Sequence, residues 1–152
     1  MPKGRPTPAQ AQLLLQLYDL RREPKLRQAR EWFMANCFAD TPEEFQRLAP
    51  PGTQENAYGR MVISYWDQAC ALLNYGLLHE ELFFETTNEF WFVWERLKAL
   101  APTYRKHYGN PYLQEHLEKA ATRYEKWMRR RAPRCLDALR QFAQQMRTAA
   151  KP

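Results

Sequence analysis

The chain has 152 residues, of which 45% are apolar and 26% are charged, with 5 glycines and a formal net charge of +6. A chain of this length and composition can bury a core of its own, which excludes a fold that depends on disulfides or metal ions. No stretch approaches the roughly 18 apolar residues of a membrane-spanning helix, and residues 1–6 precede no signal-peptide core. We therefore expect a soluble, cytoplasmic protein with no membrane association.

The charge is unevenly distributed along the chain. Residues 1–30 contain 7 basic and 2 acidic side chains, residues 31–100 contain 4 and 11, and residues 101–152 contain 12 and 4. An acidic middle between two basic ends has two explanations. Either the ends fold back onto the middle, or they face an acidic partner.

Helical spacing of apolar residues and clear helix-start and helix-stop signals predict an all-α protein. We expect a single-domain bundle of about six to seven helices over residues 7–149. A disordered basic tail is expected at 1–6 and a frayed end at 150–152. The helices are expected at about 8–22, 24–38, 42–49, 54–75, 79–101, 111–131 and 133–148.

Three sequence signals place helix ends. Thr7 and Gln10 form a predicted capping box, and Thr41 with Glu44 forms a second one. Gly76 lies where a left-handed residue would end a helix. These signals mark the start of two helices and the end of a third.

Two predicted helices are expected to form the centre of the bundle, at 54–75 and 79–101. The first has an apolar face so wide that we expect other elements to cover it on more than one side. The helix at 8–22 has a narrower apolar stripe by comparison. That stripe consists of Leu13, Leu14, Leu17, Tyr18 and Leu20.

The helix at 79–101 contains an unusual density of aromatic residues. Six large rings lie within twelve residues: Phe83, Phe84, Phe90, Trp91, Phe92 and Trp94. They cannot all lie on one helical stripe, so either the helix is buried on two sides or some rings form an exposed patch. An exposed patch would bind a partner or a second copy. The candidate residues for such a patch are Phe84, Trp91 and Phe92.

Basic side chains recur on one face of the helix at 111–131 and continue beyond it. The candidates for binding an anion are Arg123, Lys126, Arg130, Arg131 and Arg134. Three of them have no acidic partner within their own helix, so the anion must come from elsewhere. It could be a nucleic-acid phosphate, or the acidic face of the preceding helix if the two helices pack antiparallel.

That acidic face consists of Glu81, Glu85 and Glu89, spaced four residues apart. Stacked carboxylates can bind a hard cation, but a solvated or arginine-paired face is the simpler interpretation. The three cysteines, at positions 37, 70 and 135, lack metal-ligand spacing and are expected to be buried free thiols. We expect no metal, no cofactor and no assembled catalytic group.

Four blocks of sequence resemble a known family. They are Arg60-Met61-Val62 with Tyr65-Trp66, the run from Gly76 to Glu85, Trp94-Glu95-Arg96-Leu97, and Gly109-Asn110-Pro111-Tyr112-Leu113 with Leu117-Glu118. Together they are similar to the small helical bacterial proteins of domain-of-unknown-function family 4760, over residues 26–128. The resemblance implies a bacterial, all-helical, single-domain protein. It implies no reaction, so no functional residue is transferred.

The sequence thus favours a non-enzymatic module that binds another protein or itself. The alternative is a nucleic-acid-associated protein that uses the basic C-terminal helix. An enzyme of unknown type is the third interpretation.

Overall fold

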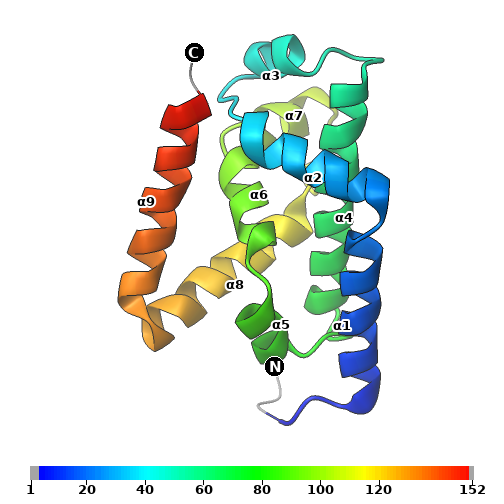
Figure 1. Ribbon diagram of the computed structural model, residues 1–152, viewed down its shortest axis with the longest axis vertical. Coiled ribbons are helices and arrows are strands. Elements are labelled where there is room, and N and C mark those ends of the chain that lie inside the picture. The colour runs from blue at the N-terminus through cyan, green and yellow to red at the C-terminus, as the bar shows by residue number, and fades with distance from the viewer. Residues whose placement is uncertain (1–3, 151–152) are drawn as a thin grey trace.

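The computed structural model describes residues 4–150, in which nine α-helices and no strand are found. The all-α prediction is confirmed, although the helices outnumber the six or seven expected. They are α1 (Pro8–Arg21), α2 (Pro24–Asn36), α3 (Pro42–Leu48), α4 (Gln54–Asn74), α5 (Glu80–Thr86), α6 (Glu89–Leu97), α7 (Ala101–His107), α8 (Glu115–Arg131) and α9 (Pro133–Ala150). Figure 1 shows α4 upright in the bundle, with α8 crossing behind and meeting α9 in an elbow.

Relative to the seven expected ranges, the two additional helices are α7 and the one produced by a break in the helix expected at 79–101. Thr87 adopts an extended backbone with φ −145° and ψ 128°, and Asn88 precedes the next helix. The Asn88 side chain makes no capping hydrogen bond, so no local cap fixes the break. The break separates α5 from α6, yet Phe83 and Phe84 of α5 contact Phe90 of α6, with ring centroids 5.1 and 5.9 Å apart.

α4 is the central helix, as expected. It packs against α2 on one side and against α8 and α6 on others, as Figure 1 shows. Its buried side chains include Val62, Trp66, Cys70 and Leu73. Three of these, Val62, Cys70 and Leu73, have no exposed surface at all.

The predicted helix caps are present. The Thr7 hydroxyl accepts a hydrogen bond from the Gln10 backbone N–H, and the Gln10 side chain accepts one from the Thr7 N–H. Thr41 accepts from the Glu44 N–H at 3.2 Å, but the Glu44 carboxylate accepts from the Asp40 N–H at 2.8 Å, so the second predicted capping box is only half formed. Gly76 has a φ of +75° at the end of α4, which confirms the left-handed stop.

A buried arginine joins α6 to the end of α2. The guanidinium of Arg96, 7% exposed, donates to the carbonyls of Phe33, Met34 and Cys37 at 3.0–3.1 Å. These carbonyls lie at the C-terminal end of α2, where the helix dipole attracts a cation. Burial lowers the pKa of Arg96 to about 10, which still leaves it charged at neutral pH.

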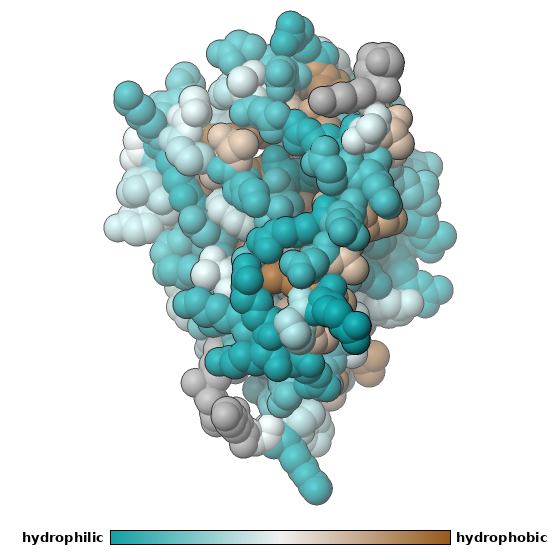
Figure 2. All heavy atoms as spheres, turned by 90° about the vertical axis from the view of Figure 1, so that its left-hand side faces the viewer, coloured by the Kyte–Doolittle hydropathy of each residue, from teal (hydrophilic) through white to brown (hydrophobic). Residues whose placement is uncertain are grey.

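α9 covers α6 from outside. Phe142 contacts the ring of Phe92 edge-on, with centroids 6.1 Å apart, and Arg140 donates to Glu125 of α8 at 2.8 Å. Leu136 is the fully buried residue of α9. Figure 2 looks onto this side of the molecule, where hydrophilic residues dominate and apolar ones appear in small patches.

The three cysteines are free thiols, as predicted. Cys37 and Cys70 are buried, and Cys135 is half-buried. Within residues 4–150, no helix has the length and apolar character needed to cross a membrane. The predicted tail and frayed end lie partly outside the described residues, because these exclude 1–3 and 151–152.

Candidate interaction site

The aromatic residues proposed as an exposed patch are buried. Phe84 is 3% exposed, Trp91 0% and Phe92 9%. The other three rings of the run are equally enclosed. The prediction of an exposed patch is therefore wrong, and burial on more than one side, the other interpretation, holds. Phe83 and Phe84 of α5 pack against Phe90 of α6, and Phe142 of α9 contacts Phe92.

The structure divides the predicted basic residues into two groups. Arg123 donates to Glu80 at 2.6 Å and to the Asn74 side chain at 2.8 Å. Arg131 contacts Glu85 at 2.6 Å and Glu81 at 3.2 Å. Both arginines are thus neutralised by acids of α5, which is the internal pairing that the sequence left open.

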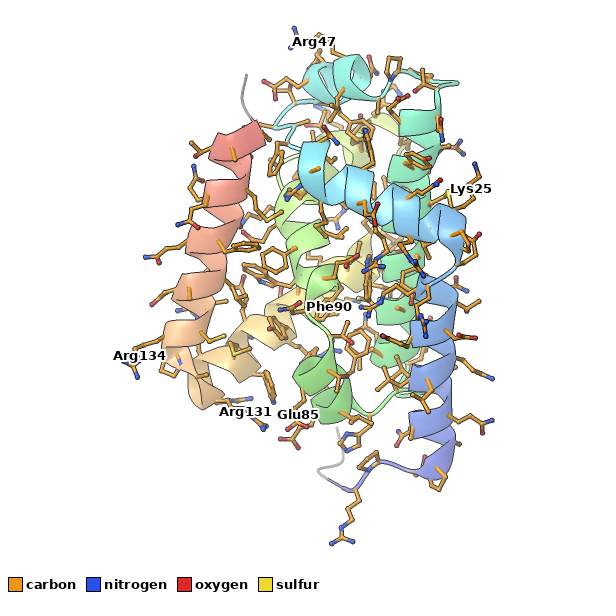
Figure 3. The ribbon with its side chains drawn as sticks, viewed as in Figure 1. Lys25, Arg47, Glu85, Phe90, Arg131 and Arg134 are labelled. Atoms are coloured by element: carbon orange, nitrogen blue, oxygen red, sulfur yellow. The ribbon has the colours of Figure 1, made fainter. Side chains whose placement is uncertain are left out.

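The other three basic candidates, Lys126, Arg130 and Arg134, are exposed. None forms an ion pair with an acid among residues 4–150. Figure 3 shows Arg134 projecting away from the bundle at the α8–α9 elbow, whereas Arg131 and Glu85 lie side by side. We call these three residues the basic elbow.

The predicted acidic face does not stay together. Glu81 and Glu85 pair with α8, but Glu89 lies beyond the break and accepts from the Arg30 guanidinium at 2.6 and 2.8 Å. Glu89 also accepts from the Trp66 indole N–H at 3.0 Å. Within the described part of the chain, no cluster of three or more potential metal ligands is found.

The most exposed apolar helix of the structure is α1. Leu15 is 68% exposed, Tyr18 51% and Leu20 61%, and Leu17 is the one buried residue of the helix. The expected stripe is therefore wrong for Tyr18 and Leu20, which face solvent. α1 runs along one edge of the bundle with its outer side uncovered (Figure 1).

An apolar crevice of about 220 Å³ lies between α1 and the bundle. Leu15 and Tyr18 form part of its α1 wall, and the opposite wall comes from α4 and α5. Its lining is Leu14, Leu15, Leu17, Tyr18, Arg21, Tyr65, Trp66, Phe83, Thr86 and Thr87. The two exposed side chains thus border a hollow that a partner's apolar side chain could enter.

Polar groups fix the position of α1 at this crevice. The Tyr65 hydroxyl donates to the Leu17 carbonyl, and burial raises the pKa of Tyr65 to about 12. Arg21 also lines the crevice, and its Nε is buried without a hydrogen-bond partner among the described residues. A buried donor without an acceptor is costly to the folded protein.

Exposed cations surround the outer side of α1. Arg5, Arg22, Lys25 and Arg27 are exposed and form no ion pair within residues 4–150. The Glu23 carboxylate is engaged in capping α2, where it accepts from two backbone N–H groups at 2.8 and 3.1 Å. Figure 3 shows Lys25 pointing outward where α1 meets α2. The crevice itself is apolar with Arg21 in its lining, and these cations, like the exposed Asp19, lie outside that lining.

The sequence contained a signal for this surface. Six of the eight residues from Leu13 to Leu20 are apolar, which is more than one stripe of a helix can hold. The aromatic run at 83–94 has a similar surplus of apolar residues, but all of its rings are buried. In α1 the surplus coincides with side chains that are exposed.

Comparison with protein families gives one match. The family model described as a domain of unknown function (DUF4760) matches residues 6–127. The match confirms the resemblance, extends it to α1 and leaves α9 outside. No curated protein and no solved structure matches the chain.

Proposed function

The chain belongs to the DUF4760 family, a domain of unknown function, and we propose that it works by binding another protein through α1. The partner segment is an acidic amphipathic helix. Its apolar side chains contact Leu15 and Tyr18 and enter the crevice beside them. Its carboxylates face the surrounding cations.

The observation that carries this proposal is the combined exposure of Leu15 and Tyr18 beside an apolar hollow. Scattered exposed apolar residues are ordinary on protein surfaces, but apolar residues that line a concavity with a polar rim are typical of a binding surface. Grooves of this kind accept helices that present side chains at helical spacing. Because the crevice is already open, little rearrangement is needed for docking.

The charges favour an acidic partner over a second copy of this chain. A symmetric pairing would bring together two surfaces that each carry Arg22 and Lys25 where α1 meets α2. Like charges across an interface oppose association, whereas complementary charges favour it and accelerate it.

The proposal can be tested by photo-crosslinking. A photoreactive phenylalanine analogue replaces Leu15 in one sample and Gln145, an exposed residue of α9, in the control. We expect position 15 to crosslink to one protein whose attached segment is acidic with helical apolar spacing. The yield should fall when Tyr18→Gln or Arg22→Glu is added. Crosslinking only to a second copy or to lipid, or equally from both positions, would contradict the proposal.

A second candidate function is supported by the basic elbow. Lys126, Arg130 and Arg134 are exposed cations without an acid among the described residues, and they lie together where α8 meets α9. Such a group can neutralise nucleic-acid phosphates with release of counterions. Arg123 is no longer part of this candidate because Glu80 neutralises it.

The test for nucleic-acid binding uses a labelled 30-mer, duplex and single-stranded, at two salt concentrations. If the elbow binds phosphate, affinity falls steeply with salt, and reversing all three charges to glutamate weakens binding for every sequence and flattens the salt dependence. Absence of binding at low salt, or equal binding by the triple variant, would exclude this function for the elbow.

A further inference from the structure

A groove on another side of the molecule lies along the first half of α4. It consists of two adjoining hollows of about 600 and 470 Å³. Both hollows are lined by Arg60 and Ile63 of α4 and by Leu113 and Gln114 of the segment before α8. Because they share these walls, the hollows form one groove of a size that holds small molecules.

The deeper part of the groove is mostly apolar. Ile63 and Leu113 face the closely packed residues Leu97, Leu100 and Tyr104 across it. Tyr108 stacks on Tyr104 with the ring centroids 6.2 Å apart and the planes 13° apart, and is 66% exposed. A wall of aliphatic and tyrosine side chains favours an apolar chain or ring system.

One cation lines this groove. The Nε of Arg60 donates to the Asn56 side-chain oxygen at 3.1 Å, and Asn56 is itself held by a bond to the Ala49 carbonyl at 3.1 Å. Arg60 forms no ion pair with an acid of residues 4–150. Its guanidinium is therefore oriented while its two terminal nitrogens stay available, the geometry that binds a carboxylate through two bonds.

The acidic side chain that lines the groove, Asp67, already accepts a hydrogen bond within the protein. Asp67 lies two helical turns from Arg60 on α4 and accepts a hydrogen bond from the Leu117 N–H at 3.0 Å. It thereby caps α8, whose own preceding residue, Gln114, makes no side-chain cap. Burial raises the pKa of Asp67. Asp67 is thus not a competing partner for Arg60.

The backbone at the groove wall is strained. Gln114 has a φ of +57° and is the non-glycine residue with positive φ in residues 4–150. This left-handed conformation is unfavourable for a residue with a side chain, and such strain is often concentrated at ligand sites. Gln114 lines both hollows.

From these observations we infer that the groove binds an anionic amphiphile, with its carboxylate on Arg60 and its apolar chain along Ile63 and Leu113. One oriented cation at the edge of an otherwise apolar groove matches a ligand with one acidic end. This site is separate from the α1 crevice, since the two share no lining residue.

The test is calorimetric titration with decanoate, compared with decyltrimethylammonium, both below their micelle concentrations. The two probes have the same chain and opposite head charges. We expect one site for decanoate and at least tenfold weaker binding of the cation. Arg60→Gln should weaken decanoate about tenfold. Arg134→Gln removes the same charge at the distant elbow and should leave the affinity unchanged.

Two further measurements locate the site. Amide resonances of Ile63, Leu113 and Gln114 should shift on titration, and Leu15→Gln in the α1 crevice should not affect decanoate. The inference is overturned if both probes bind equally, if Arg60→Gln binds like the parent, or if Leu15→Gln abolishes binding. None of these results depends on whether α1 binds a partner helix.

Discussion

Two segments of this chain, residues 13–20 and 83–94, carry more apolar side chains than one helical stripe can hold, and the fold treats them in opposite ways. The aromatic segment is divided between α5 and α6, and all its rings are buried. The aliphatic segment remains in the unbroken α1, whose outer side is left exposed. A surplus of apolar residues therefore indicates a surface only where no second element covers it.

The largest difference between the two segments should appear in stability. Phe90 has no exposed surface and contacts Trp66, Phe83, Phe84 and Tyr124, at the junction shown in Figure 3. We expect Phe90→Ala to lower the free energy of unfolding by about 3–5 kcal/mol, measured in urea.

Leu15→Ala is the matched control from the exposed segment. Because Leu15 is largely solvated, we expect a change within about 0.5 kcal/mol. Similar losses for both variants would show that α1 is covered in solution, and the contrast between the segments would disappear.

The second contrast concerns arginines. Arg96→Met removes a donor from three carbonyls at the end of α2, of which that of Phe33 still accepts from the Cys37 N–H at 2.9 Å. We expect this loss to cost about 2–3 kcal/mol. Arg22→Met at the end of α1 removes an exposed guanidinium and should stay within about 0.5 kcal/mol. Thermal and urea unfolding of both variants provides the measurement. A stable Arg96→Met protein would mean that packing alone holds α2 against α6.

A smaller, pH-dependent effect is expected at Asp67, which belongs to the covered part of the molecule. Burial raises its pKa above the ordinary value of 3.8, so the folded protein binds a proton more readily than the unfolded chain. The carboxyl therefore contributes stability that is fully present below pH 3.8 and is lost as pH rises through the folded pKa.

Asp67→Asn keeps the acceptor for the Leu117 N–H but cannot titrate. At neutral pH we expect the free energies of unfolding of the variant and the parent to differ by no more than about 1 kcal/mol. As the pH falls toward 3.8, the parent should become more stable relative to the variant. Unfolding in urea at several pH values gives this difference. If acidification instead makes the parent less stable relative to the variant, the assigned direction of the Asp67 pKa shift is wrong.

The smallest expected change is in the double variant Leu15→Gln with Tyr18→Gln. Both side chains are mostly solvated, and glutamine is a good helix former, so stability should change by no more than about 0.5 kcal/mol. Circular dichroism should report unchanged helix content. A marked loss of stability would show that these residues support the fold, and α1 would no longer be a candidate binding surface.

The sequence predicted the elements with strong local signals. Thr7 with Gln10, Thr41 and Gly76 were identified because capping depends on residues within one turn. The break at Thr87 was missed, since apolar residues continue on both sides of it and no glycine or proline marks it. Helix boundaries inside apolar runs are decided by packing rather than by propensity.

The candidate site was less predictable than the fold. Arg123 and Arg131 could be identified as arginines without local acids, but their pairing with α5 depends on how α8 is placed in space. The burial of Arg96 has no local signal at all, because its partners are backbone carbonyls about 60 residues away. The exposure of Tyr18 likewise depends on where the other helices lie, because they leave the outer side of α1 uncovered.

The position of α4 also has a consequence for synthesis on the ribosome. Its first side can be covered as soon as it emerges, because α2 has already been made. Its other side waits for α8, since Asp67 and Leu117 are 50 residues apart. At about 5–20 residues per second, that interval lasts roughly 3–10 seconds. During it the nascent chain presents the apolar face of α4 to chaperones and to neighbouring nascent chains.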